Sequence, residues 1–416
     1  MQSINDLFTA ALGIQAPWSV QEVRFQPQAN EIHFDLVCGA KRLTCPACEA
    51  ENQPIHDRRQ HTWQHLHFFQ YRAYLHADVP RVRCMACGKT SQVQVPWARP
   101  ESGFTLLFEA FALTLARTMP VHRAAQLLGI TDGRAWRVLI AHIEQARALE
   151  SHAEVTQAGV DEIHLGRLGW LTVFHDSESH RVLFTTPGKN AATFDAFVED
   201  LQAHGGDPQS IETVSMDMST AFQSGARRTL PQAKLCFDPF HLVKLAGEAL
   251  NKVRRAELKH QPELKGIRWA TLKSSKDWTL EQIQDMHWLQ RSGLKTARAW
   301  RLKERLRDIV ALARQGQPVE LLLRAWISWA RRCRLAPFKA LGATFLTHLE
   351  GIVNALQNGI SNGPAESINA TIRAAIARAC GFRSMRELSC IVYLIGGKLS
   401  HLPQSPFLTQ EATPRC

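Results

Sequence analysis

The spacing of apolar residues changes along the chain. Bulky and polar residues alternate from His61 to Leu75, as they do in β-strands. Apolar residues then recur three and four positions apart from Phe104 to Leu115, as on one buried face of a helix. Together with the motifs described below, these changes divide the chain into four regions: residues 1–98, residues 99–152, residues 153–400 and a tail of residues 401–416.

The third region has the pattern of a mixed α/β domain. Short apolar runs separated by turn residues predict three strands, then a helix, a strand, a second helix from Ser219 and a last strand. The predicted strands cover residues 155–164, 168–176, 181–186, 211–216 and 233–237, and the first helix covers residues 193–201. This order of elements is typical of an α/β core, in which ligands gather at the ends of strands.

Residues 121–139 predict two short helices joined by a turn at Gly129. The first helix would bury Ala125 and Leu128, and the second would expose Arg134 and Arg137. This is the shape of a helix-turn-helix, whose second helix reads DNA. Glycine turns also join helices that only pack together, so the segment alone leaves DNA binding and packing open.

Composition and charge narrow the class of protein. The 416 residues are 45% hydrophobic and carry a net charge of +11, which favours a polyanionic partner. Residues 251–310 contain 15 Lys or Arg and only 7 Asp or Glu, and they also contain four tryptophans. This composition fits either a surface that binds phosphate or a solvated helical face. Residues 1–16 lack the features of a signal peptide and no apolar run reaches the roughly 18 residues of a membrane span, so we expect a cytoplasmic protein.

Four of the ten cysteines form two C-x-x-C pairs, Cys45 with Cys48 and Cys84 with Cys87. Two such turns close a tetrahedral site of four thiolates, with no open position for chemistry. The spacing therefore predicts a structural Zn²⁺ in a small ribbon, whose core would be too small to fold without metal. Four unrelated buried cysteines are the alternative, and the paired spacing counts against it.

Three carboxylates lie where strand or helix ends are expected. We expect Asp161 at the end of the first α/β strand, Asp217 at the end of the fourth, and Glu366 near the start of a helix whose first turn contains Pro364. Glu366 and Arg373 would lie on the same flank of that helix. Taken singly, each carboxylate also has a structural explanation, as a helix cap, a strand end or a partner of a helix dipole.

With these motifs in order, the chain resembles the ISL-three family of bacterial insertion-sequence transposases. The matching segments are the two C-x-x-C pairs, the helix-turn-helix and residues 159–162, 215–219, 237–244, 361–366 and 381–383. The resemblance implies a multidomain protein: a zinc ribbon, an all-α helix-turn-helix and an α/β, RNase H-like DDE catalytic core with a helical insertion at about residues 242–355. It implies that Asp161, Asp217 and Glu366 are the catalytic residues. Ser367 and Ile368 depart from the family pattern.

The resemblance also implies cofactors, partners and accessory residues. Three carboxylates suit two Mg²⁺ or Mn²⁺ ions that assist phosphodiester cleavage and strand transfer. The expected partner is double-stranded DNA, both the terminal inverted repeats and the target, bound by a homo-oligomer at the bacterial nucleoid and not at a membrane. Asp238 and His241 match a D-x-x-H signature before the insertion, near the catalytic pocket. A DNA-binding regulator without catalysis and a transposase-derived nuclease are the alternatives.

Overall fold

The computed structural model describes residues 3–360, 363–405 and 407. The chain divides into two compact units: Met1–Leu149 with Ala375–Ile395 and Leu399–Cys416, and Glu150–Ala374 with Gly396–Lys398. Residues 375–395, which the sequence grouped with the α/β region, therefore belong to the unit that contains the helix-turn-helix. No helix in the described residues is both long and apolar enough to cross a membrane.

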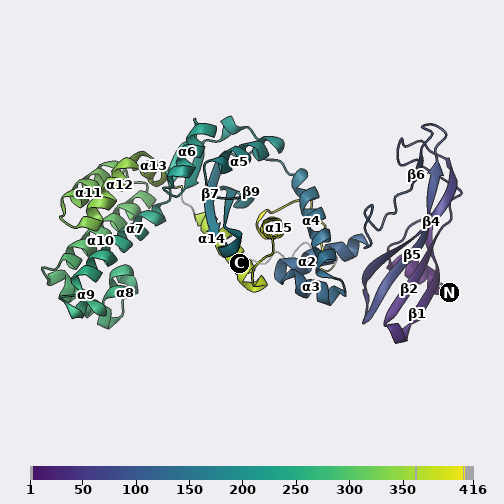
Figure 1. Ribbon diagram of the computed structural model, residues 1–416, viewed down its shortest axis with the longest axis horizontal. Coiled ribbons are helices and arrows are strands. Elements are labelled where there is room, and N and C mark those ends of the chain that lie inside the picture. Colours follow the sequence, from purple (N-terminus) through teal and green to yellow (C-terminus); the bar gives the residue numbers. More distant parts are fainter. Residues whose placement is uncertain (1–2, 361–362, 406, 408–416) are drawn as a thin grey trace. The chain divides into compact units, whose positions relative to one another are not determined.

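The N-terminal part is a six-stranded sheet (Figure 1). Its elements are α1 (Ile4–Ala11), β1 (Trp18–Gln26), β2 (Glu31–Cys38), β3 (Arg42–Leu43), β4 (Gln53–Phe68), β5 (Tyr71–Arg83) and β6 (Thr90–Gln92). The strand order is β1-β2-β5-β4-β3, with β6 paired to β5. The alternating residues predicted as strands lie in the long β4–β5 hairpin.

The N-terminal sheet is larger than the small ribbon expected from the cysteine spacing. Its strands bury a hydrophobic core of their own, which includes Trp18, Phe34, Trp63 and Leu75. The cysteine pairs lie beyond one end of the hairpin, next to the small separate cluster around Val82. Burial of the apolar surface of these core residues is the main contribution to the stability of the sheet. The cysteine site therefore stabilises one end of the sheet and not the whole of it.

Three helices follow in the same unit: α2 (Leu106–Thr118), α3 (Val121–Leu128) and α4 (Asp132–Ala148). Gly129 ends α3 with a φ of 65°, a left-handed conformation that favours glycine. Ala125 and Leu128 are buried as predicted. The later helix α15 (Met385–Gly396) contacts α4, because Arg386 pairs with Glu144 at 2.7 Å.

The second unit contains a five-stranded sheet in the order β11-β10-β7-β8-β9. Its strands are β7 (Gln157–His164), β8 (Trp170–Asp176), β9 (Arg181–Pro187), β10 (Thr213–Met216) and β11 (Lys234–Phe237). β7, β8 and β9 are antiparallel neighbours, while β10 runs parallel to both β7 and β11. Helices α5 (Ala192–Ala203) and α6 (Thr220–Thr229) lie beside the sheet in Figure 1 and pack Phe194, Phe197 and Phe222 into its core.

The residues after β11 are helical. They form α7 (Pro239–Glu257), α8 (Arg268–Leu272), α9 (Leu280–Arg291), α10 (Lys295–Arg314), α11 (Glu320–Arg332), α12 (Ala336–Thr347) and α13 (Leu349–Gln357), and α14 (Gly363–Ala379) follows. Within the basic stretch, Trp278 and Trp300 pack against each other at 6.2 Å, whereas Trp269 and Trp288 are exposed. Two of the four tryptophans are therefore packed against each other, and the other two lie at the surface.

Candidate active site and cysteine cluster

The four predicted cysteines come together at the end of the β4–β5 hairpin. The Sγ atoms of Cys45 and Cys87 lie 3.9 Å apart, and those of Cys48 and Cys84 lie 3.4 Å apart. All four Sγ atoms lie within 4.8 Å of one another. Tetrahedral Zn²⁺ with Zn–S bonds of ~2.3 Å requires sulfur atoms ~3.8 Å apart, so the cluster fits zinc.

The backbone around the cluster favours thiolates. The backbone N–H of Ala47 donates to the Sγ of Cys45, and that of Cys87 donates to the Sγ of Cys84, each over 3.4 Å. The hydrogen bond from Cys87 is the largest cause that lowers the pKa of Cys84 to about 6. Hydrogen bonds with the other thiols raise the pKa of Cys48 instead, to about 12, so the thiolate is favoured at Cys84 and not at all four positions.

Asp161 lies in the middle of β7, not at its end as expected from the sequence. The strand continues to His164 because Glu162, Ile163 and His164 still pair with β8. The Oδ1 atom of Asp161 accepts a 2.8 Å hydrogen bond from the backbone N–H of Glu162. The carboxylate is therefore held above the middle of the sheet.

Asp217 follows β10 directly, and the register of the sheet places it beside Asp161. In the parallel pairing of β10 with β7, Ser215 lies opposite Gly159. Two residues further along each strand, on the same face, are Asp217 and Asp161. The Oδ1 atom of Asp217 accepts a 2.8 Å hydrogen bond from the backbone N–H of Ser219, which precedes α6. Asp217 thus supports the start of that helix as well as facing Asp161.

Burial and neighbouring negative charge raise the pKa values of Asp161 and Glu162. Burial raises the pKa of Asp161, and the charge of Asp217 adds to the rise. Burial also raises the pKa of Glu162, to about 7, and the charges of Asp217 and Asp161 act in the same direction. The Oε2 atom of Glu162 is buried and makes no hydrogen bond to any described residue. A cluster of this kind gains from a bound cation, and its oxygen donors suit Mg²⁺ or Mn²⁺.

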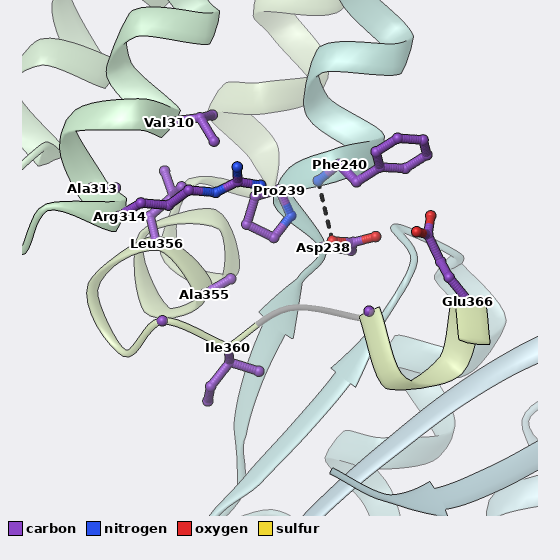
Figure 2. A pocket seen from close by; sticks show the side chains of 12 residues that line it. Asp238, Pro239, Phe240, Val310, Ala313, Arg314, Ala355, Leu356, Ile360 and Glu366 are labelled. Atoms are coloured by element: carbon purple, nitrogen blue, oxygen red, sulfur yellow. Dashed lines mark hydrogen bonds between the residues drawn. The ribbon is translucent and has the colours of Figure 1, made fainter. Parts of the chain in front are cut away.

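Glu366 lies in the first turn of α14, as predicted, and its side chain is exposed. It lines a cavity with Asp238, Pro239 and Phe240, and Figure 2 shows the carboxylates of Glu366 and Asp238 facing the same space. The oxygens of Asp161, Asp217 and Glu366 do not all lie within 4.8 Å of one another.

Asn369 connects the glutamate helix to the aspartates. It lies one turn after Glu366, is 2% exposed, and its Nδ2 donates a 2.6 Å hydrogen bond to Oδ2 of Asp161. The charge of Arg373, one further turn along α14, lowers the pKa of Asp161. Asn369 has no role in the sequence analysis, although its spacing of three residues from Glu366 places both residues on one face of α14.

Asp238 and His241 form a pair at the start of α7. The Oδ1 atom of Asp238 accepts a 3.1 Å hydrogen bond from the backbone N–H of Phe240, drawn in Figure 2, which caps the helix. The other oxygen lies 3.1 Å from Nδ1 of His241. This contact raises the pKa of His241, and the positive charge of His241 in turn lowers the pKa of Asp161. The histidine therefore faces the carboxylate cluster while Asp238 orients it.

The two arginines of the second helix differ in their surroundings. Arg137 is exposed, and its Nε donates to the backbone oxygen of Gly133 over 3.3 Å. Arg134 is half-buried, with its guanidinium 4.3 Å from the centre of the Phe104 ring. The expectation that both arginines are freely exposed is therefore wrong for Arg134, because the cation stacks on an aromatic ring from the segment before α2.

Comparisons with protein-family models match three consecutive segments. Residues 158–392 match a model described as a transposase, of the DDE type in family ISL3. Residues 93–143 match the helix-turn-helix domain of transposase family ISL3, and residues 41–87 match the zinc-finger of the transposases of IS204, IS1001, IS1096 and IS1165. The first match covers the part of the chain that a DNA-binding regulator would leave without a role.

Curated relatives are similar over almost the whole chain. The transposase for insertion sequence element IS1557 of Mycobacterium tuberculosis is 30% identical, over 95% of this chain and 97% of the relative, in both strains CDC 1551 / Oshkosh and H37Rv. The transposase for insertion sequence element IS1001 of Bordetella parapertussis is 24% identical over 83% of this chain and 86% of its own length.

Proposed function

The chain belongs to the ISL3 family of transposases, and on that basis we propose that Asp161, Asp217 and Glu366 catalyse DNA cleavage and strand transfer at the ends of its insertion sequence. The observation that carries this assignment is the hydrogen bond from Asn369 to Asp161. It brings the first turns of α14, which hold Glu366, to the strand that holds Asp161.

The topology of the α/β sheet supports an RNase H-like catalytic core. Its first three strands are antiparallel neighbours, and the fourth and fifth are added on the other side of the first, parallel to it. The proposed division is an N-terminal region (1–98), a helix-turn-helix (99–152), a catalytic domain (153–400) with a helical insertion at about 242–355, and a tail (401–416). Of the catalytic domain, residues 375–395 form part of the compact unit that contains the helix-turn-helix.

Asp161, Asp217 and Glu366 would hold two Mg²⁺ or Mn²⁺ ions. Such ions, when bound, activate the attacking water or 3′-hydroxyl and stabilise the leaving oxygen. The protein supplies the positions of the ligands: the sheet holds Asp161 and Asp217 side by side, Asn369 orients Asp161, and α14 carries Glu366. Glu366 is exposed and lines a cavity with Asp238, which leaves room for a DNA phosphate next to its carboxylate.

Isosteric substitutions test the assignment. Asp217→Asn and Glu366→Gln should leave binding to end DNA intact and reduce metal-dependent cleavage by at least about a hundredfold, since each removes a ligand charge. Two matched controls should cleave normally. Asp207→Asn changes an aspartate that also accepts from the backbone two residues on, and Glu350→Gln changes an exposed first-turn helix glutamate. Full activity of either active-site variant would overturn the assignment.

His241 is proposed to position DNA phosphate or to neutralise the carboxylates, with Asp238 orienting its ring. Asp238→Asn weakens the contact that raises the pKa of His241. The cleavage rate should therefore fall at neutral pH and recover towards acidic pH, where the histidine is protonated again. A His241→Ala protein that binds ends and cleaves at the wild-type rate would remove this role.

Recognition of the inverted repeats is proposed to lie in the helix-turn-helix. Arg137 is exposed on the second helix and is the candidate for base contacts, whereas the basic residues between 251 and 310 would contact phosphate. We propose that the protein acts as a homo-oligomer that pairs two ends and a target at the bacterial nucleoid. A strand-transfer assay separates this function from that of a nuclease that cuts without joining.

A further inference from the structure

A second group of possible metal ligands lies in the α/β unit, whereas the cysteine cluster belongs to the other unit. His152 is in the segment before β7, and Asp200 and His204 are at the end of α5. One ligand atom from each of these three side chains lies within 4.8 Å of the other two. The Oδ2 atom of Asp200 is 4.0 Å from Nε2 of His152 and 3.5 Å from Nδ1 of His204.

His152 is the unusual member of the group. Its side chain is 5% exposed, and neither ring nitrogen has a well-aligned hydrogen-bonding partner among the described residues. An imidazole buried in this way normally costs free energy unless its nitrogens are satisfied. Burial lowers the pKa of His152, so the ring is neutral and one nitrogen carries a lone pair.

The backbone holds the two histidines in place. The backbone N–H of His152 donates to the carbonyl oxygen of His204 over 2.9 Å, and the rings stack with centres 4.7 Å apart. Nδ1 of His204 donates to the carbonyl oxygen of Asp200, one helical turn earlier, over 2.7 Å, which leaves Nε2 as the ring nitrogen that can bind a metal. A second hydrogen bond that fixes the ring is the usual support for a histidine that binds metal.

We propose that His152, Asp200 and His204 bind one transition-metal ion, with Zn²⁺ as the best match. Two imidazoles and one carboxylate are the ligand types that zinc accepts beside a water molecule, whereas Mg²⁺ prefers oxygen ligands throughout. Tetrahedral bonds of ~2.0–2.1 Å place ligand atoms ~3.3–3.4 Å apart. One ligand atom from each side chain already lies within 4.8 Å of the other two, and Nε2 of His152 is 4.0 Å from Oδ2 of Asp200, so side-chain rotations would bring the ligand atoms to this geometry.

The ion would fasten the segment that leads into β7 to the end of α5. That segment is held from the other side by Arg181, which donates to the carbonyl oxygen of Ser151 over 2.9 Å and pairs with Glu150 at 3.4 Å. A bound ion would thus fix the start of the strand that carries Asp161. The role of this ion would be structural. Its site differs from the cysteine site in its ligands and belongs to the other compact unit.

The zinc content of the full-length protein tests the proposal. Protein saturated with Zn²⁺ and then separated from free metal should contain one zinc more per chain than Asp200→Asn or His204→Ala protein. Asp195→Asn is the matched control: it lies on the same helix, pairs with Arg228 at 2.6 Å, and should keep the wild-type content. Equal zinc in the wild type and both variants would overturn the site.

Cobalt provides a second readout that does not depend on total metal. Co²⁺ bound to thiolates absorbs through sulfur-to-metal charge transfer, whereas Co²⁺ bound to imidazole and carboxylate shows only weak d–d bands. With Mg²⁺ in excess to keep Co²⁺ out of the carboxylate site, Asp200→Asn should remove the weak bands and leave the charge-transfer bands unchanged. Because Asp200→Asn preserves the shape of the side chain, it tests metal binding at the histidine site even if the His204→Ala protein does not fold. Weak bands that persist in the Asp200→Asn protein would contradict the proposal.

Discussion

Asn369→Ala removes the hydrogen bond that joins α14 to the carboxylate of Asp161. The amide is 2% exposed and donates over 2.6 Å to a carboxylate whose pKa burial already raises. A hydrogen bond to a charged group is worth about 1.5–3 kcal/mol. If this orientation is needed for the reaction, the loss corresponds to a cleavage rate lower by about 10- to 150-fold.

The assay is single-turnover cleavage of end DNA in Mg²⁺, with binding and folding measured separately. Asn354→Ala is the matched control, because Asn354 is also a helix asparagine that donates to a strand, over 3.2 Å to the carbonyl oxygen of Leu235. That variant should lose about 1 kcal/mol of stability, typical of a neutral hydrogen bond, and cleave normally. A folded Asn369→Ala protein that cleaves as fast as the wild type would refute the reasoning.

Three further predictions concern the rest of the chain. Cys84→Ser should release one zinc per chain and loosen the end of the β4–β5 hairpin, and a zinc content equal to that of the wild type would count against the four-sulfur site. Gly159→Ala should lower the free energy of unfolding by about 2–3 kcal/mol, because the added Cβ would clash with the His175 ring. The control is Gly133→Ala, whose Cβ meets nothing within 4 Å. A denaturant midpoint of Gly159→Ala as high as that of the control would contradict this prediction. Arg137→Ala should abolish the preference for terminal over random DNA in a competition binding assay, and a uniform loss of affinity would identify Arg137 as a phosphate contact instead.

Much of the fold could be predicted because its signals are local. The glycine turn of the helix-turn-helix, the α/β strands and the cysteine pairs each depend on residues close together in sequence. The first α/β strand was predicted at residues 155–164 and β7 ends at His164 as predicted, so the expectation that Asp161 ends the strand was wrong although the strand itself was not. The core of the N-terminal sheet was missed because β2 pairs in parallel with the distant β5.

The parts of the sites that escaped prediction depend on contacts between distant segments. Nothing around Arg134 indicates that Phe104, thirty residues earlier, would cover its guanidinium. The contact of Asn369 with Asp161 joins residues 208 positions apart. His152 has no metal-binding spacing to Asp200 or His204, and only the packing of α5 against the segment before β7 brings the three together.

The central claim is that Asp161, Asp217 and Glu366 share one divalent-ion site, and metal-directed cleavage of the polypeptide tests it most directly. Fe²⁺ replaces Mg²⁺ at such sites, and with ascorbate and peroxide it cuts the backbone nearby through hydroxyl radicals. With Zn²⁺ present to occupy the cysteine and histidine sites, we predict Mg²⁺-suppressible cuts near all three residues, lost together in the Asp217→Asn protein. Cuts that never occur near Glu366, or that persist unchanged in that variant, would contradict a shared site.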